Sequence, residues 1–79
     1  MAAPGPIPAQ RFGQHLREIR QARGLTQKEV AERSGILIPY LSSLENGARL
    51  PTLTIVIRLA EALDCKVSQL TKVLDRTTD

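Results

Sequence analysis

The segment at residues 26–47, TQKEVAERSGILIPYLSSLENG, constrains the fold more than any other part of the chain. Thr26 and Glu29 have the spacing of a capping box, in which the hydroxyl caps a helix and the carboxylate reaches back to the amide of the cap. Gly35 permits a sharp turn, because glycine adopts positive φ at no steric cost. Gly47 can close a second helix as a left-handed C-terminal cap. The segment therefore predicts two short helices joined by a tight turn.

Helical periodicity continues on both sides of this segment, and no stretch alternates as a strand does. Gly24 is expected to stop the first helix, and Thr52 is a candidate N-cap for the fourth. We expect five helices, over about residues 9–23, 27–34, 38–45, 53–63 and 67–74. The predicted fold is all-α, a compact domain of five helices.

The ends of the chain differ in composition from this domain. Residues 1–8 hold three of the five prolines, which favours a flexible N-terminal arm. We expect the folded domain to occupy residues 9–75 and a short tail to occupy 76–79. A chain of 79 residues can fold alone, though marginally, so help from a partner subunit is expected.

The predicted fourth helix is apolar around much of its circumference. One face, expected in the core, consists of Leu53, Val56, Ile57, Ala60 and Leu63. In the fifth helix, Val67, Leu70 and Leu74 are expected to face the core. The remaining large apolar side chains of these two helices are Ile55, Leu59 and Val73, and this excess suggests either deep burial or a second contact surface. Since exposed apolar patches tend to mark interfaces, we predict that these three form part of a two-fold symmetric homodimer interface.

Composition excludes several classes of protein. The single cysteine, Cys65, cannot form an intrachain disulfide, and no signal peptide or membrane-length apolar run is present. A cytoplasmic location is therefore the default. His15 is the only histidine and lies far in sequence from Cys65, and there is no phosphate-binding glycine loop or metal-ligand spacing. The sequence predicts no enzyme, no cofactor and no small-molecule ligand. A net charge of +3 favours an anionic partner, although only weakly.

The predicted helix over 38–45 has two distinct faces. Leu41 and Leu44 point to one side, with Leu37 just before the helix on that side. The opposite side and its flanks carry Ile38, Pro39, Tyr40, Ser42, Ser43 and Asn46. Such a face can be solvated and bind nothing. In a small basic domain, however, two closely joined helices also serve to present one of them to the DNA major groove.

Three stretches, LREIRQARGLTQKEVAERSG, YLSSLENGARLPT and LAEAL, resemble the lambda-repressor-like helix-turn-helix domain, and more narrowly its Cro/C1-type, or XRE, family. The resemblance extends over residues 12–70. It implies a helix-turn-helix motif at about 27–46 and a double-stranded DNA partner. It also implies a dimeric regulator that places the 38–45 helix in the major groove at each half of a near-palindromic operator. Restriction-modification controllers, phage repressors and antitoxins of similar size belong to this family, and activator and repressor roles both stay open.

The resemblance also implies roles for individual residues. The positions expected to contact DNA are Gln27, Lys28, Ile38, Pro39, Tyr40, Ser42, Ser43, Asn46 and Arg49. Gln27, Asn46 and Arg49 are expected at phosphates. Arg20 and Glu45 are expected to form a structural ion pair that fixes the third helix against the first.

The sequence departs from the family pattern at three places. Leu37 stands where relatives usually have a Ser or Thr N-cap, and Ile38 and Pro39 stand where many have polar residues. These side chains cannot hydrogen-bond to bases, so readout would rest on thymine methyl groups, DNA shape, Tyr40 and Ser43. An alternative is a protein-interaction module that keeps the fold without base readout. Asp64 stands after the predicted fourth helix, where relatives commonly have a C-terminal glycine. This departure affects stability and not DNA binding.

Overall fold

The computed structural model describes residues 5–75. It contains five α-helices and one 3-10 helix: α1 (Ile7–Ala22), α2 (Gln27–Ser34), α3 (Ile38–Glu45), α4 (Leu53–Ala62), α5 (Val67–Thr71) and η1 (Lys72–Leu74). No strand occurs in the described range. The predicted all-α architecture of five helices is confirmed.

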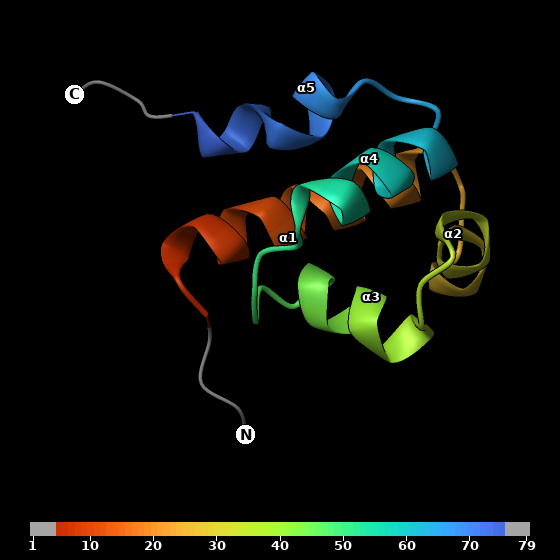
Figure 1. Cartoon of the computed structure of the whole chain (residues 1–79), viewed down its shortest axis with the longest axis horizontal. Helices are drawn as coiled ribbons and strands as arrows, with labels where there is room; N and C mark the ends of the chain where they lie inside the picture. The colour runs from red at the N-terminus through yellow and green to blue at the C-terminus, as the bar shows by residue number, and fades with distance from the viewer. Residues whose placement is uncertain (1–4, 76–79) are drawn as a thin grey trace.

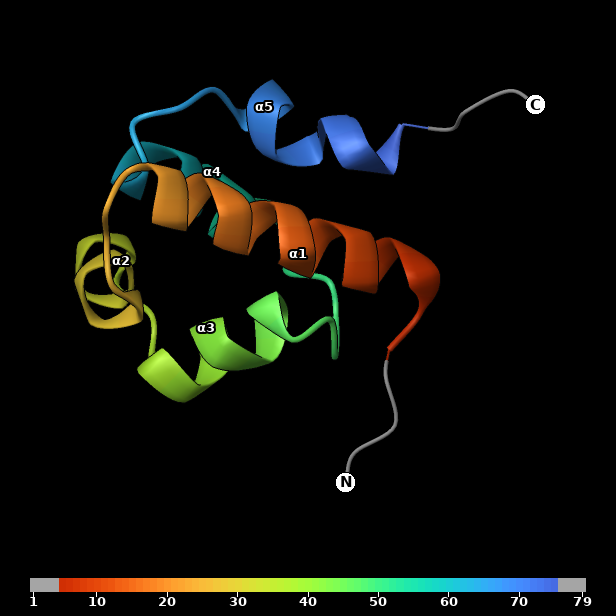
Figure 2. The ribbon, with the colours of Figure 1, turned by 180° about the vertical axis from the view of Figure 1, so that it is seen from behind.

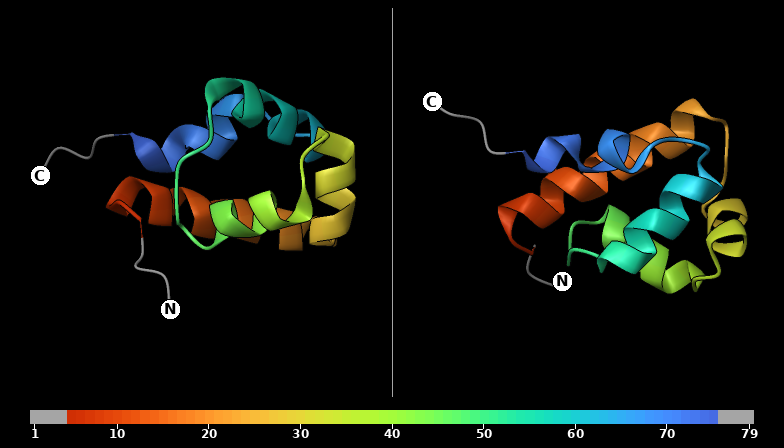
Figure 3. Two further views of the ribbon diagram at one scale, coloured as in Figure 1. Left: turned by 60° about the horizontal axis from the view of Figure 1, so that its bottom comes forward. Right: turned by 45° about the horizontal axis from the view of Figure 1, so that its top comes forward.

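Helix α1 lies at the centre of the arrangement. Helix α3 packs along one side of α1, and α5 with η1 packs along the other side (Figures 1 and 2). Helix α2 crosses the end of the molecule and contacts both α3 and α4. Two further views show α3 and α4 joined by a long loop that runs across the molecule (Figure 3). Helix α3 therefore has one supported side and one outer side.

The capping box that the sequence predicts is present at the start of α2. The Thr26 hydroxyl oxygen accepts from the Glu29 amide at 3.1 Å, and Glu29 Oε1 accepts from the Thr26 amide at 3.0 Å. Gly35 follows α2 with a φ of 70°, in the left-handed region. These local interactions fix where α2 begins and how the chain turns into α3.

The N-terminal boundary differs from the prediction. Helix α1 begins at Ile7, with Pro6 at the N-cap position and Pro8 in the first turn. Proline is tolerated in the first turn because the backbone N–H that it lacks would have no partner within the helix. The Gly5 amide donates to the Gly47 carbonyl at 3.1 Å, and Gln10 Nε2 donates to the Gly5 carbonyl at 2.7 Å. Residues 5–8 are thus tied to the domain and do not belong to a flexible arm. The rest of the predicted arm and the predicted tail at 76–79 lie outside the described residues.

The core is aliphatic apart from one phenylalanine. Its fully buried large side chains are Phe12, Leu16, Val30, Leu41, Leu44, Leu59, Leu63 and Leu70. Helix α4 buries a stripe centred on Leu59, which is inaccessible to solvent, and leaves Leu53 and Ile57 exposed at 67% and 44%. The prediction had placed Leu53 and Ile57 on the core face and Leu59 in the homodimer interface. It was wrong because both stripes of this helix are apolar, and only packing against α2 and α5 selects between them.

The last turn of the fold also differs from the prediction. The fifth α-helix ends at Thr71, and the chain tightens into η1. A 3-10 helix has three residues per turn, so its side chains follow a different rotation from those of an α-helix. Leu74, expected in the core, is 38% exposed as a result.

A glycine brings α1 and α3 unusually close together. Gly13 is buried on α1, and a β-carbon at this position would collide with the backbone carbonyls of Leu44 and Glu45. This contact places the C-terminal end of α3 directly against the backbone of α1.

Candidate nucleic-acid interface

The outer face of α3 is an exposed surface of mixed polarity. Leu37 and Ile38 are 75% and 42% exposed, and Pro39 is also exposed. Three side chains on this helix are half-buried: Tyr40, Ser42 and Ser43. Leu41 and Leu44, on the opposite side, have no solvent exposure. The division into two faces agrees with the sequence prediction, and Leu37 differs by facing solvent.

The start of α3 is held without a side-chain cap. Leu37 occupies the N-cap position, and no side chain bonds to the amides of the first turn. The first backbone N–H groups of a helix lack partners within it. Pro39 has no N–H, so Ile38 and Tyr40 present theirs at this end. Ser43 donates its hydroxyl hydrogen to the Tyr40 carbonyl at 2.7 Å, which leaves the Ser43 oxygen as an acceptor.

Glu45, at the end of α3, is the centre of a buried hydrogen-bond network. Its side chain has no solvent exposure and forms the expected ion pair with Arg20. The pair is bidentate, with Arg20 Nε at 2.7 Å from Oε2 and Nη2 at 3.0 Å from Oε1. Gln27 Nε2 donates to Oε1 at 3.1 Å, and Arg17 Nε donates to the same oxygen at 3.3 Å. One carboxylate therefore joins α1, α2 and α3.

The charge state of Glu45 follows from these contacts. Burial alone would raise the pKa of the carboxyl, but hydrogen bonds from Arg20, Gln27 and Arg17 and the positive charge of Arg20 outweigh burial and lower it. Glu45 is consequently ionised at neutral pH. No buried side-chain nitrogen or oxygen in the described range lacks a hydrogen-bond partner.

Two residues of this network change the interpretation made from the sequence. Gln27 was expected to reach a phosphate, and its side-chain amide instead donates to Glu45, so one N–H remains for another acceptor. Arg17 was not identified at all. Its Nη2 also donates to Asn46 Oδ1 at 2.8 Å. The available signal was its position three residues before Arg20, which puts both arginines on one side of a helix.

The remaining predicted DNA-contacting residues lie around α3. Lys28 is exposed in the first turn of α2, and Asn46 and Arg49 are exposed after α3. Gly47, between Asn46 and Arg49, has a φ of 76° and a β-carbon there would meet Gln10 Cα at 2.8 Å. The structure thus brings polar and cationic groups to both ends of the exposed helix face.

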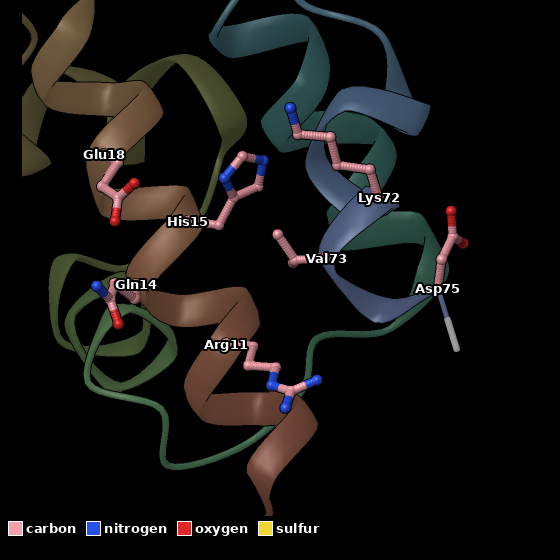
Figure 4. A pocket seen from close by; sticks show the side chains of 7 residues that line it. All are labelled: Arg11, Gln14, His15, Glu18, Lys72, Val73 and Asp75. Carbon is pink, nitrogen blue, oxygen red and sulfur yellow. The ribbon is translucent and has the colours of Figure 1, made fainter. Parts of the chain in front are cut away.

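The predicted dimer residues do not form one surface. Leu59 is fully buried in the core, and Ile55 is half-buried against it. Val73 is half-buried and lines an open pocket between α1 and η1, where His15 and Lys72 also point (Figure 4). The prediction for Leu59 was wrong for the reason given above, the choice between two apolar stripes.

The two residues considered for chemistry have structural surroundings. His15 Nε2 lies 2.6 Å from the Gln69 carbonyl and links α1 to α5. Burial raises the pKa of the Cys65 thiol, so the thiol is protonated at neutral pH. Within residues 5–75, no three His, Cys, Asp or Glu side chains are grouped so that they could hold a metal ion. None of the helices described there is long and apolar enough to cross a membrane.

Comparison with known proteins places this arrangement in a family. A helix-turn-helix family model matches residues 16–70. The HTH-type transcriptional regulator y4dJ of Sinorhizobium fredii is 43% identical over 65 residues, which are 82% of this chain and 84% of that protein. The propionyl-CoA carboxylase regulator of Cereibacter sphaeroides is 46% identical over 59 residues, 75% of this chain but only 13% of that protein.

Solved structures agree with the sequence matches. The restriction-modification controller protein C.AhdI from Aeromonas hydrophila superimposes with a TM-score of 0.77 at 40% identity, covering 78% of this chain and 94% of that one. The clp gene regulator ClgR from Corynebacterium glutamicum has a TM-score of 0.80 at 29% identity, with 86% and 88% covered. The chain therefore belongs to the Cro/C1-type, or XRE, family of helix-turn-helix transcriptional regulators.

Proposed function

We propose that the protein regulates transcription by binding specific double-stranded DNA as a dimer, with α3 of each protomer in the major groove of a near-palindromic operator. The observation that carries this proposal is the exposed outer face of α3 on a helix that the buried Glu45 network fixes to α1 and α2. A major groove admits one α-helix, and a rigidly held helix keeps its side chains in register with base edges.

Groups beside α3 support backbone contacts. The first turn of α2 offers backbone amides, the exposed Lys28 and the remaining N–H of Gln27. Asn46 and Arg49 lie at the other end of α3. Phosphate contacts at both ends would fix the orientation of α3, and they carry no sequence information themselves.

Base readout would come from four residues of α3. Ile38 and Pro39 are exposed and apolar, so they suit thymine methyl groups. Tyr40 can donate and accept through its phenol, and Ser43 offers an acceptor. No side chain in this set makes bidentate hydrogen bonds, so we expect modest discrimination at each base, with DNA shape adding to it.

The dimer surface is proposed on α4, with a second copy of the chain as the partner. Leu53 and Ile57, one turn apart, are exposed there, and Leu50 precedes the helix at 44% exposure. A two-fold axis beside α4 would set each patch against its own copy. The test is sedimentation at tens of micromolar with Leu53 and Ile57 both replaced by serine. We expect a dimer for the natural chain and a monomer for the variant, whereas a monomeric natural chain with and without DNA would refute the dimer.

A gel-retardation assay with duplex DNA, in the presence of nonspecific competitor DNA and at moderate salt, tests DNA binding itself. We expect a retained complex with a selected duplex and loss of that complex with a scrambled one. Equal binding to both duplexes would argue against sequence-specific recognition.

A second candidate is a protein-interaction module, which the 75% exposure of Leu37 beside the exposed Ile38 and Pro39 favours. In that case the apolar start of α3 would bind a protein surface. Replacement of Leu37 by serine separates the two functions, because Leu37 lies before the α3 residues that are proposed to face the major groove. Protein binding would be lost with this variant, while specific DNA binding would be kept.

A further inference from the structure

We propose that Arg17 is a phosphate-binding residue, and that the shallow groove between α1 and the C-terminal end of α3 receives a phosphodiester of the DNA backbone. The groove is lined by Gln10, Gln14, Arg17, Glu18, Glu45 and Asn46. This inference rests on the proposed DNA-binding function and adds a contact that the sequence did not predict.

The charge balance at Glu45 leaves Arg17 available. Two arginines meet one carboxylate, but Arg20 makes the short bidentate pair at 2.7 Å and 3.0 Å, whereas Arg17 makes one contact at 3.3 Å. The Arg20 side chain is 12% exposed and that of Arg17 is 41% exposed. Arg20 therefore neutralises Glu45, and the charge of Arg17 is free to attract a second anion.

The guanidinium of Arg17 is already oriented. It spans from Glu45 to Asn46, to which Nη2 donates at 2.8 Å. A guanidinium has five N–H donors, and these two bonds use two of them, so three remain. A fork of donors held in this way matches the oxygens of a phosphate, and the loss of side-chain entropy on binding is reduced because the side chain is held beforehand.

The position of the groove favours DNA backbone over another anion. It opens beside Asn46, three residues before the exposed Arg49, at the end of α3 that would meet a strand flanking the major groove. Glu18 also borders the groove and is unfavourable for an anion. Glu18 additionally borders the pocket on the η1 side of α1, with Arg11 and His15 (Figure 4). The proposed phosphate therefore lies at the Asn46 end, away from Glu18.

The experiment measures affinity for one selected duplex at several salt concentrations with Arg17→Gln. Arg11→Gln is the matched control, because Arg11 is an exposed arginine of the same helix on the η1 side (Figure 4). One lost phosphate contact lowers the slope of log affinity against log salt by about 0.9, or about 1.8 for a dimer. The advantage of the natural chain over Arg17→Gln should thus shrink by about 12-fold between 50 and 200 mM salt, with base preference unchanged.

The variant Arg17→Lys distinguishes the effect of the positive charge from the effect of the hydrogen bonds that Arg17 donates to Glu45 and Asn46. Lysine keeps the charge but cannot span both partners, so we expect most of the slope to return. A natural slope with Arg17→Gln, or the same slope change with Arg11→Gln, would overturn the phosphate role while leaving the proposed function intact. A reduced slope that Arg17→Lys does not restore would also overturn it. Failure of the natural chain to bind any duplex over competitor would refute both the function and this inference.

Discussion

Replacement of Glu45 by glutamine tests how α3 is held in place. The carboxylate is fully buried and accepts hydrogen bonds from Arg20 at 2.7 Å and 3.0 Å and from Gln27 at 3.1 Å. Glutamine keeps the shape of the side chain but removes its charge. Its side-chain NH2 replaces one carboxylate oxygen, so a donor would face the N–H donors of Arg20 and Gln27. The Arg20 charge would then lose its partner at a site where only 12% of the side chain reaches solvent.

The size of the effect follows from this geometry. Removing one partner of a buried ion pair costs about 3–5 kcal/mol. We expect about 3 kcal/mol, the lower end, because Arg20 keeps its bond to the Leu25 carbonyl at 2.9 Å and some contact with water. Since a domain of 79 residues has a total stability of about 4–12 kcal/mol, the variant would lose a large share of it. Urea denaturation at pH 7 measures the loss, with the exposed Glu32→Gln as a control for charge alone.

The same variant has a predicted pH dependence. Because the pKa of Glu45 is lower in the folded protein than its ordinary value, its stabilisation is complete above the unfolded pKa and disappears as pH falls through the folded one. The difference between the natural chain and Glu45→Gln should therefore be full at pH 7 and shrink below about pH 4.3, the ordinary glutamate value. A loss under about 1 kcal/mol at pH 7, typical of an exposed pair, would refute the reasoning. A difference that stays constant down to pH 3 would refute it as well.

Two further substitutions test the backbone geometry. Asp64 has a φ of 52°, so Asp64→Gly should relieve strain and stabilise the fold by about 1 kcal/mol in thermal unfolding, and an unchanged or lower melting temperature would contradict this. Gly13→Ala should destabilise the fold by about 1–3 kcal/mol, because its β-carbon would push α1 away from the carbonyls of Leu44 and Glu45. A stabilised Gly13→Ala variant, as helix propensity alone would give, would show that α1 and α3 are not in close contact.

Much of the fold could be predicted because it depends on local interactions. The Thr26–Glu29 capping box and the turn at Gly35 lie within a few residues of each other, and both are present. The division of α3 into a buried side with Leu41 and Leu44 and an outer side followed from helical geometry alone. The predicted helix over 38–45 has the same bounds in the structure.

The errors arose where distant segments decide the outcome. Helix α4 carries two apolar stripes, and its contacts with α2 and α5 bury Leu59 and expose Leu53 and Ile57. The folded domain begins before the predicted residue 9 because the Gly5 amide bonds to the Gly47 carbonyl, a partner far away in sequence. Which apolar stripe is buried and where the folded domain begins depend on tertiary packing, and the periodicity within one helix does not predict this packing.

The site was predictable in its outline but not in its hydrogen bonds. The Arg20–Glu45 pair could be expected from the family resemblance. The additional donors from Arg17 and Gln27 depend on how α1, α2 and α3 cross around one carboxylate. The spacing of the sequence places these residues on helices and does not specify which of them share an acceptor.

Selection of binding sites from random duplex DNA tests the central claim, that α3 determines which sequence is bound. The natural chain, Tyr40→Phe, Ser43→Ala and Arg49→Ala would each be used, and the selected sites compared. We predict two related half-sites for the natural chain and altered base preference with Tyr40→Phe and Ser43→Ala. Arg49→Ala should weaken binding to all sequences alike and leave the selected site unchanged. The same site selected by all four proteins would contradict base readout by α3.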